Sequence, residues 1–196
     1  MTESRFFRVP PLVAAVVAAA LQTAVIGYMV EGRASILRSG ADIRLKTQPV
    51  DPRDLLRGDY VILSYPISTI PKSIVTGEGP KGGAWTRLFV RLKPGADGLW
   101  AATEASFATL PAQEGSVVLR TLPFDYYTGA DGGMPDTLFV QYGIERYYVP
   151  EGDGKALEDA RNQEELEVEA RVSRDGTAQI ARLILKGEPI YEEPLY

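Results

Sequence analysis

The hydrophobic positions of the chain follow two patterns, one continuous and one alternating. From Leu12 to Val30, nineteen residues follow one another without a charge, and Gln22 and Thr23 are the plainly polar ones among them. As an α-helix, a run of this length measures about 28 Å, close to the thickness of the hydrocarbon layer of a bilayer. The run therefore predicts a transmembrane helix over residues 9–30.

The flanks of this run predict its orientation. Arg5 and Arg8 precede it, so the positive-inside bias places residues 1–8 in the cytoplasm and everything after Glu31 on the other side. A cleaved signal peptide is the alternative, but its apolar core usually has only about 7–15 residues, and no clear cleavage site is present. We expect an uncleaved anchor, followed by a short stalk over residues 31–41.

Beyond the stalk, apolar and polar residues alternate in short runs that are separated by turn residues, which is typical of β-strands. Hairpin turns are predicted at residues 94–98 and 174–176, and a flexible loop at residues 129–135. A helix is predicted over residues 155–162, with Asp153 as its cap. The predicted strands cover residues 42–47, 60–68, 86–92, 99–107, 116–122, 137–142, 144–149, 165–173, 177–185 and 190–191.

Short strands at close spacing with one short helix predict a mainly β domain over residues 42–196. Such a pattern is typical of a small barrel or a two-sheet sandwich. A parallel α/β fold would need repeated amphipathic helices between its strands, and the sequence has none.

Composition narrows the chemistry of this domain. The formal net charge is −5 for the chain and +1 for residues 1–30, which leaves −6 for the remainder. This acidic balance argues against nucleic acid and anionic lipid as partners. Histidine and cysteine are both absent, which excludes a Ser-His-Asp triad, a Cys nucleophile and a disulfide framework. We predict no metal and no cofactor.

The densest local signal is the segment Pro-Val-Asp-Pro-Arg-Asp-Leu-Leu-Arg-Gly-Asp-Tyr-Val-Ile-Leu-Ser-Tyr, which covers residues 49–65. Asp51 at the cap, Pro52 at the first helical position and Asp54 in the first turn predict a helix of one or two turns. Gly58 permits the positive φ that turns the chain into a strand. From Tyr60 onward the residues alternate into the core.

This segment resembles the GDYXXLXY family, which is named for the pattern. All five fixed positions are matched, by Gly58, Asp59, Tyr60, Leu63 and Tyr65. The flanking residues 51–55 and 146–151 also look like those around the motif in such proteins, which makes Arg146 and Glu151 secondary candidates. The resemblance implies a bacterial membrane-anchored protein without an assigned activity. It also implies a multi-pass membrane protein as partner, because the domain occurs beside or joined to such proteins.

Two interpretations of the motif remain open. In the first, Gly58 makes a turn, Asp59 ties it to nearby N–H groups, and the apolar and aromatic residues fill a sheet. In the second, a polar cluster docks a ligand or a partner, and its arginines receive an anion. The cluster consists of Arg53, Asp54, Arg57 and Asp59, and Asp51 at the cap is a further possible binding residue.

A membrane-tethered hydrolase is the alternative from another class. The layout around Gly58 is similar to that of signal peptidases, which use a Ser/Lys pair, and Lys72 follows downstream. Pro49 occupies the position of the nucleophile, however, and proline has no hydroxyl. Ser35 lies too far upstream, and Ser64 has no base assigned to it.

Paired carboxylates are the other catalytic possibility. Acidic residues are abundant, but their spacing singles out no pair among Glu104, Glu114, Asp125, Asp131 and Asp136. Glu151 and Asp153 offer oxygen ligands to Ca²⁺, although a solvated loop before the helix explains them as well. We therefore predict that the protein is not an enzyme.

These patterns together predict a single-pass protein of a bacterial inner membrane. Its N-terminus is expected in the cytoplasm and its β-rich domain in the periplasm. The expected role is accessory: the domain binds a multi-pass membrane protein, and residues 12–30 contact the bilayer. A hydrolase and a sensor of a small ligand or anion are the alternatives.

Overall fold

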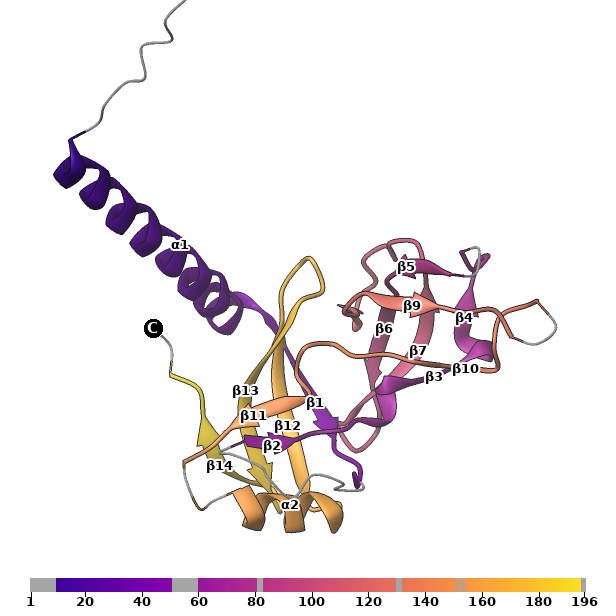
Figure 1. The fold of residues 1–196 in the computed structure, drawn as a ribbon. Coiled ribbons are helices and arrows are strands. Elements are labelled where there is room, and N and C mark those ends of the chain that lie inside the picture. The colour runs from indigo at the N-terminus through magenta and orange to yellow at the C-terminus, as the bar shows by residue number, and fades with distance from the viewer. Residues whose placement is uncertain are drawn as a thin grey trace, which may run out of the picture.

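The computed structural model describes residues 10–50, 60–80, 83–129, 132–150, 152 and 154–194. This part of the chain contains two helices and fourteen strands (Figure 1). The mainly β class is confirmed, and the described strands form several open sheets rather than a closed barrel. The elements are α1 (Pro11–Ser39), β1 (Ala41–Lys46), β2 (Tyr60–Ile62), β3 (Thr69–Pro71), β4 (Val75–Thr76), β5 (Ala84–Thr86), β6 (Phe89–Pro94), β7 (Trp100–Ser106), β8 (Val117–Arg120), β9 (Phe124–Tyr126), β10 (Thr137–Phe139), β11 (Arg146–Tyr148), α2 (Gly154–Asn162), β12 (Leu166–Val172), β13 (Ala178–Leu185) and β14 (Glu188–Glu192).

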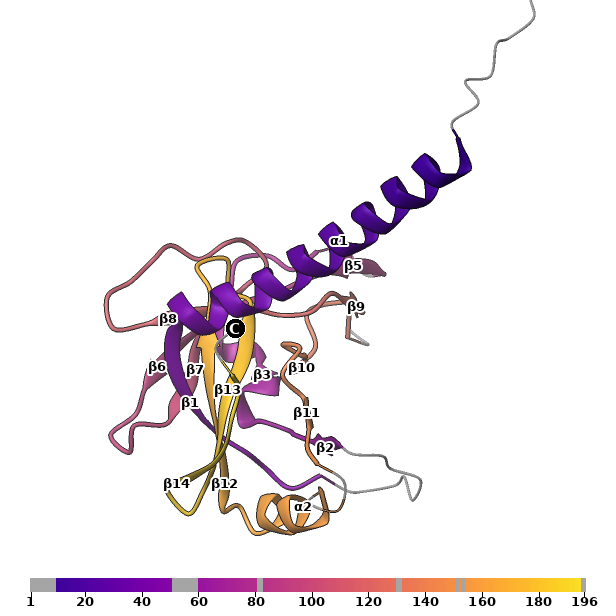
Figure 2. The same ribbon diagram turned by 90° about the vertical axis from the view of Figure 1, so that its left-hand side faces the viewer.

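Helix α1 projects from one corner of the β domain (Figures 1 and 2). It is long and apolar enough to cross a membrane, and its apolar part is exposed to the surroundings. The hydroxyl of Thr23 donates a 2.9 Å hydrogen bond to the carbonyl of Ala19, so this polar group is satisfied within the helix. These features are consistent with a membrane anchor.

The sequence led us to expect that the helix ends at Val30, but it continues to Ser39. Residues 31–39, predicted as a stalk, form its last turns and pack on β12 and β13. Ala34 and Leu37 lie on the packed side and are buried, because residues three apart share one face of a helix. At Gly40 the chain leaves the helix. A Cβ there would lie 2.7 Å from the carbonyl oxygen of Ile36, so the close approach requires glycine.

Two four-stranded sheets form the framework of the domain. One has the strand order β1-β12-β13-β14 and carries the end of α1; the other has the order β4-β7-β6-β8. The predicted hairpins β6–β7 and β12–β13 are confirmed. One hydrophobic core runs through both sheets, with Ile43 and Val168 from the first and Val90 and Leu119 from the second.

Shorter ribbons complete the domain: β2 pairs with β11, β3 with β10, and β5 with β9. Helix α2 contacts β2 and β12. The buried Arg161 on α2 donates a 2.5 Å hydrogen bond to the carbonyl of Ile62 at the end of β2. This contact fixes the helix beside the strand that leaves the motif.

Several predicted strands are shorter than expected. The strand expected over residues 60–68 is divided into β2 and a 3₁₀ turn at Pro66–Ser68, because proline cannot donate a ladder hydrogen bond. The strand expected over residues 86–92 is divided between β5 and β6, and the hydroxyl of Thr121 accepts a 2.9 Å hydrogen bond from the amide of Leu88 at the break. The helix expected over residues 155–162 is confirmed as α2.

Candidate functional site

The second half of the motif enters the core in the alternating way that the sequence predicts. Val61, Leu63 and Tyr65 are all buried, whereas Tyr60 is half-buried. Strand β2 pairs antiparallel with β11, and beyond it the amide of Leu63 donates a 2.9 Å hydrogen bond to the carbonyl of Glu145. The motif therefore continues its pairing past the end of the strand.

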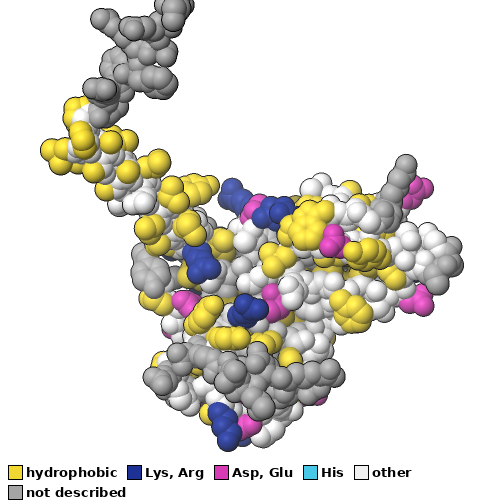
Figure 3. Space-filling view, in the orientation of Figure 1, with side chains coloured by type: hydrophobic (Ala, Val, Ile, Leu, Met, Phe, Trp, Pro, Cys, Tyr) yellow, Lys and Arg dark blue, Asp and Glu magenta, His cyan; other side chains and the backbone are white. Residues whose placement is uncertain are grey.

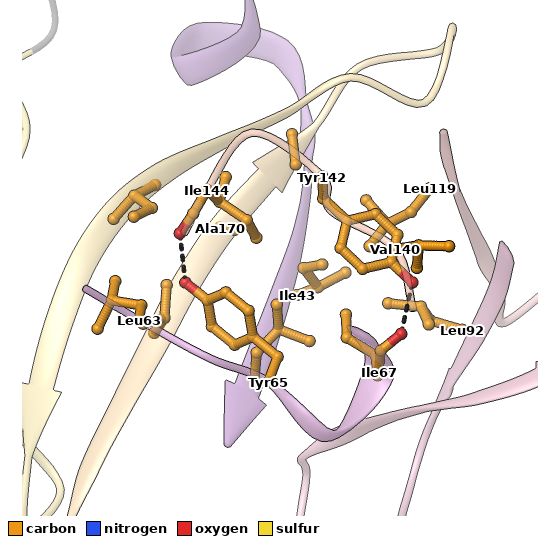
Figure 4. Packing of buried hydrophobic residues seen from close by; sticks show 14 of the residues in the cluster. Ile43, Leu63, Tyr65, Ile67, Leu92, Leu119, Val140, Tyr142, Ile144 and Ala170 are labelled. Atoms are coloured by element: carbon orange, nitrogen blue, oxygen red, sulfur yellow. Dashed lines mark hydrogen bonds between the residues drawn. The ribbon is translucent and has the colours of Figure 1, made fainter. Parts of the chain in front are cut away.

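Two buried tyrosines join this segment to the one before β11. The Tyr65 hydroxyl donates a 2.7 Å hydrogen bond to the carbonyl of Ile144, and the Tyr142 hydroxyl donates one of 2.6 Å to the carbonyl of Ile67 (Figure 4). Burial, and secondarily the Glu145 carboxylate, raise the pKa of both hydroxyls well above the ordinary tyrosine value. Each segment thus supplies a hydroxyl to the backbone of the other, and Tyr65 has a structural role.

The turn between these hydrogen bonds directs Arg146 to the surface. Gly143 adopts a φ of +87°, which favours glycine. The carboxylate of Glu145 accepts hydrogen bonds from the amides of Tyr142 (2.6 Å) and Gly143 (2.9 Å). After this turn the residues of β11 alternate, so Tyr147 points into the core while its neighbours Arg146 and Tyr148 are exposed.

On the exposed side, Arg146 joins two tyrosines. Its guanidinium lies over the ring of Tyr60, 5.7 Å from the centroid, and the rings of Tyr60 and Tyr148 are 5.9 Å apart and tilted by 55°. Register explains the group, because Tyr60 and Tyr148 are directly opposed in the β2–β11 pair. The structure thus brings together Tyr60 and Arg146, two of the predicted site residues.

A cavity of about 500 Å³ lies beside this group, at the end of the apolar helix; we call it the helix-base pocket. The last turns of α1, strand β11 with the turn before it, β13 and the segment after β14 enclose it. Figure 3 shows hydrophobic side chains along the visible face of α1 and basic side chains beside its base. The lining residues are Val30, Arg33, Ala34, Leu37, Gly143, Ile144, Arg146, Tyr147, Tyr148, Gln179, Ile180 and Glu193.

The charges in the helix-base pocket come from separate parts of the chain. Arg33 belongs to α1, Arg146 to β11, and Glu193 follows β14. Burial, followed by the interaction with the neighbouring Glu193 carboxylate, raises the pKa of Tyr147. One carboxylate, next to a tyrosine, and two guanidinium groups therefore line the same space.

The catalytic alternatives find no support in the geometry of the described residues. The Ser64 hydroxyl accepts a 2.9 Å hydrogen bond from the side-chain amide of Gln48, and among the described residues it forms no hydrogen bond with a lysine or a carboxylate. Glu104 forms an ion pair of 2.7 Å with Arg91. Among the side chains that the structure describes, no group of three or more acidic residues is placed to hold a metal ion.

The polar half of the motif cannot be placed in this site. The following predicted residues lie outside the described part of the chain: Asp51, Arg53, Asp54, Arg57, Gly58, Asp59 and Glu151. The interpretation of these residues as a docking cluster therefore stays a prediction. Within the described part, Tyr60 and Arg146 are the predicted residues that reach the surface, and Leu63 and Tyr65 lie in the core.

Comparison with known protein families shows to which family this chain belongs. The family model described as GDYXXLXY protein matches residues 22–183, which is most of the chain. The chain belongs to this family. Neither the curated proteins nor the solved structures gave a match. The match of the GDYXXLXY model includes α1 from Gln22 onward, the motif, the sheet β4-β7-β6-β8 and the other four-stranded sheet as far as Leu183 in β13, so it covers most of the helix and of the domain.

For this member of the GDYXXLXY family, sequence reasoning missed part of the exposed site. Arg33 and Tyr148 were not singled out, although Arg33 is the first basic residue after the apolar run and Tyr148 lies in the flanking segment that resembles the family. Glu193 lies in the tail 188–196, which the sequence offered either as a binding peptide or as a final strand with a solvated end. Its place beside Arg33 and Arg146 depends on the path of the chain after β14, which the sequence pattern does not reveal.

Proposed function

We propose that this protein is a single-pass, membrane-anchored accessory protein that binds a multi-pass membrane protein. In this proposal α1 spans the bacterial inner membrane with its N-terminus in the cytoplasm, and the β domain lies in the periplasm. The observation that carries the proposal is the continuity of α1. One helix of 29 residues joins an exposed apolar part to a docked end, without a linker between them.

The docked end supports a fixed height of the domain above the bilayer. Arg171 on β12 donates a hydrogen bond to the carbonyl of Leu37 and forms a 2.8 Å ion pair with Asp42. A cation at the C-terminal end of a helix also interacts favourably with the helix dipole. Residues 31–39 measure about 14 Å along the helix. The domain is thus held next to the headgroups rather than on a long tether.

Exposed aromatic side chains support a protein partner for the domain. Trp85 on β5 and Tyr127 just after β9 each expose 68% of their surface, and Phe139 on β10 exposes 76%. Large exposed apolar side chains on a folded domain often mark a protein contact. A multi-pass membrane protein offers both partners that this arrangement needs, helices for α1 within the bilayer and extracytoplasmic loops for the domain.

Cysteine labelling tests the topology, because the natural chain contains no cysteine. Ala96→Cys places a thiol in the exposed β6–β7 turn, and Thr2→Cys places one before the helix. In intact cells with a permeabilised outer membrane, an impermeant maleimide should label Ala96→Cys and leave Thr2→Cys unlabelled until the cells are lysed. The reverse pattern, or a soluble product that lacks the first thirty residues, would refute the proposed anchoring.

Photo-crosslinking tests the partner. A photoreactive phenylalanine analogue placed at Val16 on α1 and at Phe139 on the domain should crosslink the same multi-pass protein in native membranes. The analogue at Glu114, an exposed polar position between β7 and β8, serves as the control. The protein purified in mild detergent should retain this partner. Crosslinks that match the Glu114 control, together with a purification that recovers no multi-pass protein, would refute the accessory role.

A further inference from the structure

The helix-base pocket lies at the level where α1 leaves its uncharged run. Val30, the last residue of that run, is part of its lining, and Arg33 follows three residues later, about 4.5 Å further along the helix axis. If residues 12–30 occupy the hydrocarbon layer, the mouth of the pocket is at the height of the lipid headgroups. This step relies on α1 as a membrane anchor and not on a protein partner.

The charge of the helix-base pocket differs from that of the domain. Residues 31–196 carry a formal charge of −6, but two arginines and one glutamate line the pocket. Within the described residues, neither Arg33 nor Arg146 forms an ion pair; Arg146 stacks on Tyr60. The Glu193 carboxylate interacts with the neighbouring Tyr147 side chain. Two guanidinium groups therefore remain available to an anion at this position.

The rest of the pocket lining is mainly apolar, so a ligand that fits the pocket has an apolar part besides its anionic group. Ala34, Leu37, Ile144 and Ile180 are buried around the cavity and give it an apolar inner wall. Tyr148 is 74% exposed at its edge, in the position that tyrosine favours at a membrane interface. A ligand that fits both parts carries a phosphate at one end and acyl chains at the other.

We propose that the helix-base pocket binds the phosphate of a phospholipid headgroup, with Arg33 and Arg146 as the ligand-binding residues. The planar guanidinium group offers paired N–H donors that match phosphate oxygens. The acyl chains of the lipid would continue along the apolar surface of α1 into the bilayer. The lipid thereby connects the anchor helix with β11, which pairs with the motif strand.

Native mass spectrometry of the full chain in a phosphate-free detergent tests this site. Dioleoyl-phosphatidylglycerol is added to the wild type and to the double variant Arg33→Gln/Arg146→Gln. We expect one retained lipid per wild-type chain and at least a tenfold weaker retention by the double variant. Arg87→Gln is the matched control, because Arg87 is exposed at a distant position between β5 and β6. It should bind like the wild type.

Three further arms identify the ligand. Dioleoylglycerol, which has the same acyl chains but no phosphate, should not be retained. Glycerol phosphate, which has no acyl chains, should compete only at concentrations at least a hundredfold higher. The double variant Arg33→Lys/Arg146→Lys keeps the charge and should recover part of the binding.

Several results would overturn the proposal. Equal lipid retention by the double glutamine variant and by Arg87→Gln would exclude the two arginines, and so would the absence of binding by the wild type. Competition by glycerol phosphate at the concentration of the lipid would assign the pocket to a soluble anion. The near-ultraviolet circular dichroism of each variant is compared with that of the wild type. Because no other protein is present, a failure here is distinct from a failure to find the multi-pass partner.

Discussion

Replacing Tyr65 by phenylalanine isolates one hydrogen bond in the core. The side chain is fully buried, and its hydroxyl donates a 2.7 Å hydrogen bond to the carbonyl of Ile144, a residue that is only 2% exposed. Phenylalanine keeps the ring, so the packing contacts remain. The variant instead loses a hydrogen bond and leaves a buried acceptor without this donor, which costs about 1–3 kcal/mol of the free energy of unfolding.

The loss is large enough to measure by thermal unfolding. For a protein of this size, 1 kcal/mol corresponds to roughly 2–4 °C in Tm, so a loss of about 2 kcal/mol lowers Tm by about 4–8 °C. The assay is near-ultraviolet circular dichroism of the full chain in detergent. Tyr148→Phe is the control, because that tyrosine is exposed. If Tyr65→Phe unfolds at the same temperature as this control, the hydroxyl has no structural role and the reasoning fails.

Three other perturbations test separate parts of the structure. Burial raises the pKa of Tyr142, so its hydroxyl is protonated in the folded state when the unfolded chain begins to ionise near pH 10. Stability should be constant below that pH and fall as pH rises above it, and urea titrations at pH 9–11 should show a shallower fall for Tyr142→Phe; an unchanged slope would contradict the buried assignment. Leu37→Ala removes a buried contact worth about 2 kcal/mol or more, so amide hydrogen exchange at the end of α1 should accelerate roughly thirtyfold or more, whereas exposed Leu21→Ala should leave it unchanged. Gly176 has a φ of +84°, and an added Cβ would lie 2.9 Å from the amide nitrogen of Arg120. In denaturant titrations, Gly176→Ala should therefore lower the free energy of unfolding by at least about 1 kcal/mol more than Gly187→Ala, because Gly187 also has a positive φ but lies in open space. Equal losses would show that the turn at Gly176 is not in close contact with β8.

The spacing of apolar residues predicted the helices and strands that depend mainly on neighbouring residues in the sequence. The apolar run before Val30 requires a helix, and the alternation in residues 165–185 gave the β12–β13 hairpin with its turn in the right place. The same reasoning placed Val61, Leu63 and Tyr65 on one buried face. It overestimated the length of the strand that begins at Tyr60, because the extent of a strand depends on hydrogen bonds to a partner strand that the local sequence does not reveal.

The end of α1 shows the limit of this reasoning. After Val30 the charges of Glu31, Arg33 and Arg38 resemble a solvated linker, and the helix continues because Ala34 and Leu37 find an apolar surface on β12 and β13. Stability gained from tertiary packing decides helicity there, as it does for many amphipathic segments. The pattern of the segment contains the two buried positions, but not the sheet that covers them.

The sequence by itself determined that this chain has an apolar helix able to span a bilayer and that a β-rich domain follows it. It also determined that the second half of the GDYXXLXY motif begins a strand whose alternate side chains lie in the core. These properties depend on residue type and spacing along the chain, which are local. Only the tertiary structure decided that Arg33, Arg146 and Glu193 share one pocket, because they are more than a hundred residues apart at the extremes and meet through the pairing of β11 and the return of the chain after β14. The formal charge of the whole chain is that of an acidic protein, whereas the fold places two of its arginines where the apolar part of α1 ends.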